Sequence, residues 1–318
     1  MTTINSTIKG KAYEYACVVA LDKIVSKYRK IAIENNESLK IAKDRFEQIT
    51  SKEKKEMLLS AHAGISSILQ MEPRIIEDGK DTLSVSLQPD NVAKQFGDIR
   101  DILIIRRSIK WEIGVSVKHN HSALKHSRLS MNLDFGNEWT NTPCSKKYFT
   151  EIKPIFEQLT ILKARNIKWN QISKKEDKVY VPILQAFIKE FLRLNKQFNI
   201  TNSLMKYLIG SNGRDYYKLI HTNKHITKVI PFNVYGTLNQ SSSKQKPNIK
   251  IPKIILPTKI LDLDFKEKSK TTIILTMNNG WAISFRIHNA STIVEPSLKF
   301  DVQLLGSPDA LFYIDAKW

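Results

Sequence analysis

The sequence has only two cysteines, Cys17 and Cys144, in 318 residues. They stand far apart with no second thiol near either, which argues against a disulfide framework and against a cysteine-based zinc site. No apolar run approaches ~18 residues, the length that a membrane-spanning helix requires. The first residues, MTTINSTIKGK, contain no apolar segment of a signal peptide. These absences predict a cytoplasmic protein.

Acidic residues are scarce relative to basic ones. Asp and Glu number 31 against 50 Lys and Arg, and the formal net charge is +19. A Lys-rich composition from an AT-biased genome explains part of this excess, but such a bias normally raises Glu as well. The imbalance therefore favours a polyanionic partner, either nucleic acid or an acidic membrane surface. Hydrophobic residues make up 42%, which is enough for a buried core and excludes a disordered chain.

The first part of the chain has helical periodicity. Apolar residues recur at spacings of three and four over 8–33, and two more amphipathic helices are predicted over 38–49 and 52–71. Pro73 ends this helical section.

The pattern then changes to that of strands. Residues 83–87 alternate between apolar and polar, and 101–106 and 111–118 are short, apolar and β-branched. The connection over 107–110 is short, so the last two strands are predicted to pair antiparallel. A helical stretch is predicted over 121–132.

Four segments follow from these patterns. Residues 1–145 are expected to form a core that contains the strands over 83–118, and 146–238 a mainly helical section that contributes to nucleic-acid binding, in line with the basic charge. Residues 239–253 are polar and rich in Ser, Lys and Pro, which is typical of a flexible loop. Residues 254–318 are β-rich and are expected to pack on the core and contribute to DNA recognition. The predicted fold is α/β, with a mixed central sheet flanked by helices.

The strand over 111–118 carries the residues that indicate chemistry. Its side chains alternate between two faces, so Glu112, Ser116 and Lys118 share one face. Asp101 opens the neighbouring strand. Carboxylates can hold one or two divalent cations that lower the pKa of a water molecule, and a nearby lysine can orient or deprotonate that water. The combination predicts phosphodiester hydrolysis.

This arrangement resembles the PD-(D/E)XK nuclease superfamily, in which an Asp begins one strand and an acid, a spacer and a Lys end the next. Here Ser116 stands at the position of the second acid and Lys118 at that of the lysine. The resemblance implies that Asp101 is the anchoring metal ligand, with Asp98 as the reserve.

Two residues can supply the missing carboxylate. Glu112 lies on the same strand face, about two pleat repeats back. Glu14 lies on the first predicted helix. Members of the superfamily often place an accessory Glu on an early helix, so Glu14 is the preferred second ligand.

A longer resemblance covers nearly the whole chain. The segments SVKHNHSALKHSRLS from Ser116, RIHN from Arg286 and SLKFD from Ser297 are similar to the HaeIII family of type II restriction endonucleases. The resemblance implies cleavage of double-stranded DNA at GGCC, magnesium as cofactor, a bacterial source and a partner methyltransferase that protects host DNA. A palindromic site favours a two-fold dimer, although some restriction enzymes act as monomers.

The run after Lys118 supplies candidate phosphate contacts. In one-letter code His119-Asn120-His121 reads HNH, which is also the name of a nuclease motif. The residues of that motif come from a longer strand–strand–helix unit and not from three neighbouring positions. We expect both histidines to face DNA phosphate or to cap the next helix. Lys125 and Arg128, with His126 between them, would share a helix face beside the scissile phosphate; the alternative is a solvated basic helix.

Base recognition at G·C pairs needs donors aimed at guanine O6 and N7. The candidates are Arg214, Arg286 and Lys299, with polar edge contacts from Asn289 and His288. Arg286 could instead satisfy backbone carbonyls within the β region. Two rival functions remain open at this stage: a non-catalytic DNA-binding protein such as a repressor, and a repair or RNA nuclease on the same fold.

Overall fold

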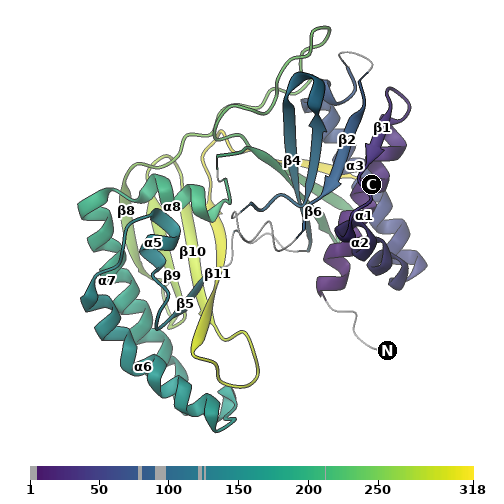
Figure 1. Cartoon of the computed structure of the whole chain (residues 1–318). Coiled ribbons are helices and arrows are strands. Elements are labelled where there is room, and N and C mark those ends of the chain that lie inside the picture. The colour runs from purple at the N-terminus through teal and green to yellow at the C-terminus, as the bar shows by residue number, and fades with distance from the viewer. Residues whose placement is uncertain (1–5, 78–80, 90–97, 121–123, 125–126, 212) are drawn as a thin grey trace. The chain divides into compact units, whose positions relative to one another are not determined.

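The computed structural model describes residues 6–77, 81–89, 98–120, 124, 127–211 and 213–318 (Figure 1). The chain divides into two compact units, and each is described by itself. Unit 1 comprises Met1–Ser122, Ser211–Ile254 and Asp309–Trp318, and unit 2 comprises Ala123–Gly210 and Ile255–Pro308. The predicted segment boundaries at 145 and 238 therefore fall inside units rather than between them.

Three helices form one layer of unit 1: α1 (Ser6–Val25), α2 (Glu37–Gln48) and α3 (Ser51–Met71). The Asn36 side chain caps α2, and a capping box of Thr50 and Glu53 begins α3. Helix α1 ends at Val25, eight residues before Ile33, where the predicted helical pattern ends. Residues 31–33 instead form a strand that pairs with β2 (Leu83–Leu87). No helix in the described ranges has the length and apolar character needed to cross a membrane.

A seven-stranded sheet forms the other layer of unit 1, in the order β1-β2-β3-β4-β6-β7-β12. It is mixed, because β1 pairs parallel with β2 and β4 parallel with β6, whereas the other pairs are antiparallel. The strands are β1 (Ile31–Ile33), β2 (Leu83–Leu87), β3 (Ile102–Arg106), β4 (Trp111–His119), β6 (Tyr216–Thr222), β7 (Ile226–Phe232) and β12 (Ile314–Lys317). The mixed α/β architecture confirms the predicted class.

Strands β3 and β4 pair antiparallel, as predicted, with Ile102 opposite Val115 and Ile104 opposite Ile113. These four side chains are buried in the core of unit 1, together with Val117 on the same face of β4 and residues of α1 and α3. The helices therefore cover the face of β4 that carries its odd-numbered residues. The even-numbered residues, including Lys118, lie on the other face.

The predicted helical section over 146–238 ends at Leu208 in the structure. Beyond it, β6 and β7 form a hairpin whose turn includes His225 at a positive φ of 52°. The β-branched and aromatic residues of these strands suit a buried sheet. Between β7 and unit 2, residues 239–253 form no helix or strand, and Asn239 Nδ2 donates to the carbonyl oxygens of Met71 and Ile249.

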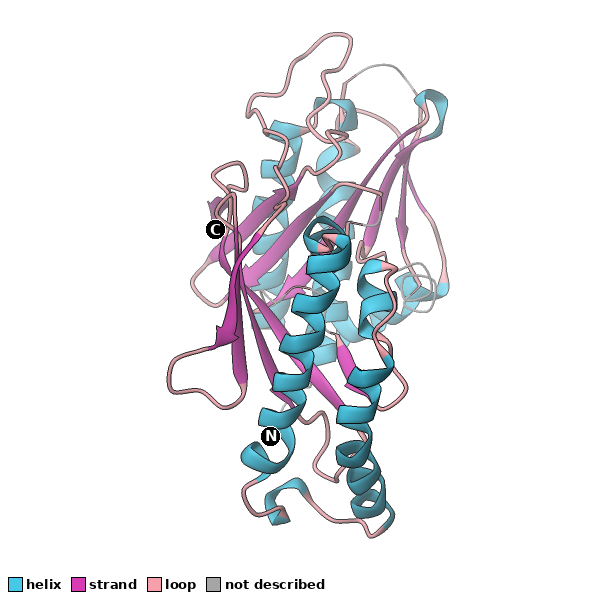
Figure 2. Cartoon of the chain, turned by 90° about the vertical axis from the view of Figure 1, so that its left-hand side faces the viewer, coloured by secondary structure: helices cyan, strands magenta, loops and turns pink. Residues whose placement is uncertain are grey.

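Unit 2 contains a five-stranded antiparallel sheet in the order β5-β11-β10-β9-β8. Its strands are β5 (Arg128–Ser130), β8 (Ile260–Phe265), β9 (Thr272–Met277), β10 (Ala282–His288) and β11 (Ser297–Gly306). Its helices are α5 (Phe135–Thr140), α6 (Lys146–Ala164), α7 (Val181–Phe198) and α8 (Thr201–Leu208), with short turns η3 (Trp169–Gln171) and η4 (Glu176–Tyr180) (Figure 2).

Aromatic side chains join the helices of unit 2 to its sheet. The rings of Trp139 on α5 and Phe285 on β10 are stacked with centroids 6.4 Å apart, and Phe187 on α7 lies 5.2 Å from Phe300 on β11. The helix predicted over 121–132 is wrong for Arg128–Ser130, which forms β5. This strand pairs with Ser297–Lys299, about 170 positions away, a long-range contact that no local pattern reveals. His121, Lys125 and His126 lie outside the described residues.

Candidate active site

Asp101 and Lys118 meet where β3 begins and β4 approaches its end. The Lys118 Nζ lies 3.2 Å from Asp101 Oδ2. The same oxygen accepts the Val117 N–H at 2.6 Å and the Ser116 hydroxyl at 3.3 Å. These three donors come from consecutive residues, so the last part of strand β4 fixes the Asp101 carboxylate and the Lys118 amine relative to each other. The predicted pairing of Asp101 with Lys118 is thus present in the structure.

Ser116 occupies the position where a second acid was expected. Its side chain is fully buried and donates to Asp101. A hydroxyl in this place adds no negative charge, and its observed contact orients the carboxylate of Asp101. Ser116 therefore provides no second carboxylate at this position.

Glu14 on α1 provides a carboxylate near this pair. Its side chain is buried, with 7% of the residue exposed, and its Oε2 accepts from Lys11 Nζ one turn earlier at 3.1 Å. The pKa of Glu14 is raised to about 8, chiefly by burial and then by the negative charge of Asp101, while Lys11 and Lys118 oppose the shift. The charge of Asp101 therefore acts on the Glu14 carboxyl and disfavours its ionised form.

Lys218 is a second amine beside the site that the sequence reasoning missed. It lies on β6 opposite Ser116 in the parallel β4–β6 pair, and only 4% of it is exposed. Burial lowers its pKa to about 7, and the charge of Lys118 lowers it as well, while Asp101 opposes the shift. The sequence feature that could have indicated this buried amine is the single lysine within the apolar and aromatic run YYKLIHT.

Histidine rings extend the site on the helix-covered face. His119 stacks on His221 at 4.8 Å between centroids, and His221 stacks on Trp318 at 5.3 Å. Tyr13, next to Glu14, lies 5.3 Å from His221. Burial is the main cause that lowers the pKa of both histidines, that of His221 to about 4. Both rings are therefore harder to protonate than a free imidazole.

The two other candidate ligands, Asp98 and Glu112, bind Arg100 instead. The Arg100 Nη2 lies 2.6 Å from Asp98 Oδ2, and its Nη1 lies 2.7 Å from Glu112 Oε1. Although burial opposes it, hydrogen bonding from Arg100 lowers the pKa of Asp98. Glu112 is four residues from Ser116 along β4, roughly 13 Å at ~3.3 Å per residue. The structure does not bring Glu112 to the Asp101–Lys118 pair.

Gly114 makes the path of Arg100 possible. A Cβ atom at this position would lie 2.0 Å from Cδ and 2.6 Å from Cγ of Arg100. The arginine stem therefore crosses β4 directly over the glycine and delivers its guanidinium to Glu112. Arg214 binds the same Glu112 oxygen from the loop before β6.

The remaining candidates for DNA contacts belong to unit 2. Arg286 Nη2 lies 3.2 Å from Asp301 Oδ2 on the neighbouring strand, and the Arg128 Nη1 donates to the Ser297 hydroxyl at 3.2 Å. Lys299 lies on β11 opposite His288. Arg286 pairs with a carboxylate rather than with the backbone carbonyls considered above.

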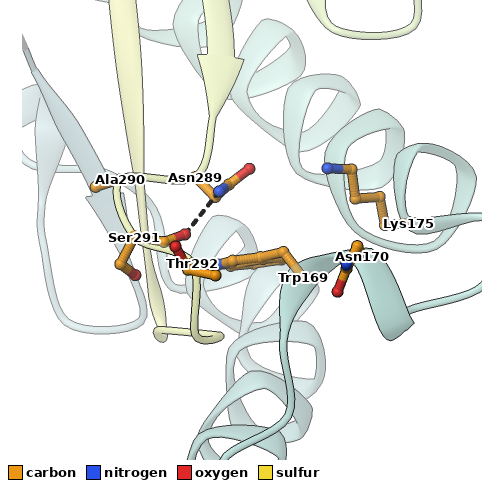
Figure 3. Close-up of a pocket in the computed structure, with 7 residues that line it drawn as sticks. All are labelled: Trp169, Asn170, Lys175, Asn289, Ala290, Ser291 and Thr292. Atoms are coloured by element: carbon orange, nitrogen blue, oxygen red, sulfur yellow. Dashed lines mark hydrogen bonds between the residues drawn. The ribbon is translucent and has the colours of Figure 1, made fainter. Parts of the chain in front are cut away.

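Asn289 lines a pocket of about 430 Å³ in unit 2, which also includes Trp169 and Lys175 (Figure 3). Its side chain is engaged by neighbours: Oδ1 accepts from the Tyr180 hydroxyl at 3.2 Å, and Nδ2 donates to the Ser291 carbonyl at 2.7 Å. The amide edge of Asn289 is thus already used within the unit.

Comparison with known proteins gives two matches. The sequence profile of the HaeIII restriction endonuclease family matches residues 10–308. The type II restriction enzyme HaeIII of Haemophilus aegyptius is 46% identical to the chain over 316 residues, which cover 98% of each protein. No solved structure matches the chain.

Proposed function

The chain belongs to the HaeIII restriction endonuclease family and is a type II restriction endonuclease, and from this premise we propose that it cleaves double-stranded DNA at GGCC with magnesium as cofactor. The choice of GGCC rests on the 46% identity with the HaeIII enzyme over nearly the full length of both proteins. The observation that supports the chemistry is the meeting of Asp101, Lys118 and the buried Glu14 at one end of the sheet.

We also assign the core of unit 1 to the PD-(D/E)XK superfamily. In support, an Asp precedes β3, a Lys stands near the end of β4, and an acidic side chain from α1 completes the group. Ser116 departs from the pattern of that superfamily, and Glu14 supplies the carboxylate that is missing there.

The side chains at this site suit a divalent cation. Glu14 and Asp101 present oxygen ligands, and a bound cation would favour the ionised form of Glu14, whose pKa burial raises. No three His, Cys, Asp or Glu side chains gather into a metal-binding group within the described part of the chain, so water and phosphate oxygens would complete the coordination. When bound, the cation would polarise the scissile phosphate and lower the pKa of a water molecule.

The protein's own groups have distinct tasks in this proposal. Asp101 and Glu14 would hold the cation, and the hydroxyl of Ser116 and the N–H of Val117 keep Asp101 in one orientation. Lys118 Nζ, 3.2 Å from Asp101, orients the attacking water and offsets negative charge as it grows on the phosphate. Lys218 provides a second amine on the neighbouring strand β6, directly opposite Ser116.

DNA contacts are assigned to both units separately. We propose phosphate contacts for His119 and, in the segment that follows it, for His121, Lys125 and Arg128. In unit 2, Arg286 and Lys299 are the proposed base-reading residues, with Asn289 and His288 beside them. The protein is expected to work in the bacterial cytoplasm beside a methyltransferase that modifies GGCC, and as a two-fold dimer on its palindrome.

Incubation of an unmethylated plasmid with the protein, with magnesium or with a chelator, tests the proposal. Discrete fragments with ends at GGCC, formed only with magnesium, are the expected result. A smear would indicate a nonspecific or repair nuclease, and an intact plasmid that is nevertheless bound would indicate a non-catalytic binding protein. Plasmid methylated at GGCC is the matched control and should stay uncut.

A further inference from the structure

Arg214 presents an exposed guanidinium that is held by a carboxylate. Its side chain is 58% exposed, and its Nη1 binds Glu112 Oε1. The same oxygen accepts from Arg100 Nη1 at 2.7 Å, so two guanidinium groups share one acceptor. Arg214 is thus a solvent-facing cation whose guanidinium is held by a carboxylate that is itself held by Arg100.

The support of Glu112 is buried. Arg100 is 4% exposed, and its guanidinium also binds both carboxylate oxygens of Asp98 at 2.6–3.0 Å. Its stem is confined over Gly114, where no Cβ fits. Because Arg100 cannot move without breaking these contacts, Glu112 has a defined position and so does the guanidinium that it holds.

The backbone that carries Arg214 is equally restrained. The Ser211 hydroxyl donates to the Arg214 carbonyl at 2.9 Å. The next residue, Asp215, is buried and accepts backbone N–H groups at 2.6–2.8 Å from Val234, Tyr235 and Thr237. Both ends of the Arg214 side chain are therefore held, which lowers the entropy that the side chain would lose on binding a ligand.

Arg214 also lies on the same face of the sheet as the catalytic lysine. Glu112 and Lys118 are both even-numbered residues of β4, on the face opposite to α1 and α3. Six residues separate them, roughly 20 Å at ~3.3 Å per residue. Because this span is larger than the major-groove width of about 12 Å, the two ends of this face of β4 are expected to contact different parts of one duplex.

We propose that Arg214 is a specificity-determining residue that donates two hydrogen bonds to O6 and N7 of a guanine in the recognition site, with Glu112 and Arg100 as its positioning residues. This inference rests on the proposed cleavage at GGCC. A phosphate contact requires only a positive charge, whereas a guanine edge requires a planar fork at a fixed angle. Glu112 supplies that fixation, and its negative charge reduces the attraction of Arg214 to phosphates in general.

The test measures binding to short duplexes that contain GGCC or a variant with one base pair replaced, with calcium in place of magnesium. It compares the wild type with Arg214→Lys, Arg214→Ala and Arg107→Ala, the last a control that removes an exposed arginine near the same end of β4. We expect Arg214→Lys to lose about ten- to a hundredfold of its discrimination at one G·C position and its symmetry mate, while its affinity for non-specific DNA stays close to that of the wild type. Arg107→Ala should match the wild type.

Glu112→Gln should relax discrimination at the same position by a smaller factor, because the amide holds Arg214 less tightly. Uniform weakening on all duplexes with a reduced salt dependence would show a phosphate contact and overturn the proposal. Full discrimination by Arg214→Lys would overturn it too. Failure of the proposed function looks different, because then the wild type itself would not prefer GGCC. Thermal unfolding of each variant verifies that the compared proteins are folded.

Discussion

Strand β4 carries a charged cluster at each end. At the Trp111 end, Asp98, Arg100, Glu112 and Arg214 form the Arg100 cluster, in which two acids meet two guanidinium groups at hydrogen-bonding distance. At the His119 end, Glu14, Asp101, Lys118 and Lys218 form the Lys118 cluster, which also has two acids and two bases. The composition of the two clusters is alike, but burial affects the pKa values of their members differently.

In the Arg100 cluster each charged form is stabilised by its neighbours. Despite burial, hydrogen bonds lower the pKa of Asp98 and raise that of Arg100. In the Lys118 cluster burial has the larger influence: the pKa of Glu14 rises to about 8 and that of Lys218 falls to about 7. The compensated charges of the Arg100 cluster suit a structural clamp. In the Lys118 cluster, burial disfavours the charged forms of Glu14 and Lys218 beside the Asp101–Lys118 ion pair, and such perturbed groups are typical of functional sites.

The largest effect should come from the amine of the Lys118 cluster. Lys118→Ala removes the group that orients water and offsets charge on the phosphate, so we expect the cleavage rate to fall about 10³- to 10⁴-fold. Single-turnover cleavage of a GGCC duplex measures the rate, and a gel-shift assay should show that specific binding survives. Cleavage near the wild-type rate would remove Lys118 from the mechanism.

Glu14→Gln tests whether α1 contributes the second carboxylate. The loss of one metal ligand should reduce cleavage about 10²-fold and raise the magnesium concentration needed for half-maximal rate. Glu47→Gln on α2 is the matched control, since Glu47 is exposed and remote from the site. If Glu14→Gln keeps its magnesium-dependent activity while Glu112→Gln destroys it, the ligand assignment is wrong and the two clusters have exchanged roles.

Gly114→Ala should disrupt the Arg100 cluster. The added methyl would lie 2.0 Å from the Arg100 stem, so the arginine must leave its two carboxylates, at a cost of about 3 kcal/mol in the free energy of unfolding. Gly10→Ala in α1 is the control, since nothing lies within 4 Å of its added methyl and the change should stabilise the helix by up to ~1 kcal/mol. Urea unfolding measures both. Equal stabilities would mean that Arg100 is free to move.

Glu72 limits the use of a raised pKa as a mark of function. It is buried away from both clusters, and burial raises its pKa to about 7 although the Asn239 N–H and the Tyr217 hydroxyl bind it. Its Oε2 has no hydrogen-bond partner among the described residues. The raised pKa of Glu72 is thus explained by burial alone, and a raised pKa indicates function only where a lysine such as Lys118 lies beside the acid.

The sign of the Glu72 effect follows from its pKa, which is higher in the folded than in the unfolded state. Its stabilising contribution is complete below about pH 4.5 and is lost as the pH rises through 7. Glu72→Gln removes this dependence, so wild type should lose about 2 kcal/mol relative to the variant between pH 5 and pH 8. Unfolding curves at the two pH values measure the difference. Parallel behaviour of the two proteins would show that Glu72 does not titrate in this range.

The sequence predicted those parts of the site that depend on near neighbours. Asp101 and Lys118 are 17 positions apart, and a short connection with strict alternation brings them to one edge of an antiparallel pair. Glu14 came from the resemblance, because a helical pattern alone does not say where a helix packs. The Arg100 cluster was missed, because the role of Gly114 appears only when a side chain crosses it.

Long-range pairing accounts for most of the remaining errors. Lys218 reaches Ser116 across 102 positions through the parallel β4–β6 pair, and Arg128 joins a strand that begins at Ser297. Parallel strands are joined by long connections, so the local sequence of one strand does not predict which distant strand pairs with it. The strands β6 and β7 within the mainly helical section 146–238 were not predicted, and the place of β6 in the sheet depends on its distant partner β4.

The division of unit 1 into three separate stretches has a consequence for how the protein forms. Its last stretch, Asp309–Trp318, is synthesised after all of unit 2, yet it contributes β12 and the Trp318 ring that covers His221. Pairing between such distant segments slows folding, because loop closure must precede the contacts that reward it. The nuclease sheet of a growing chain therefore stays unfinished on the ribosome, and cleavage competence is expected to be among the last properties that the nascent protein acquires.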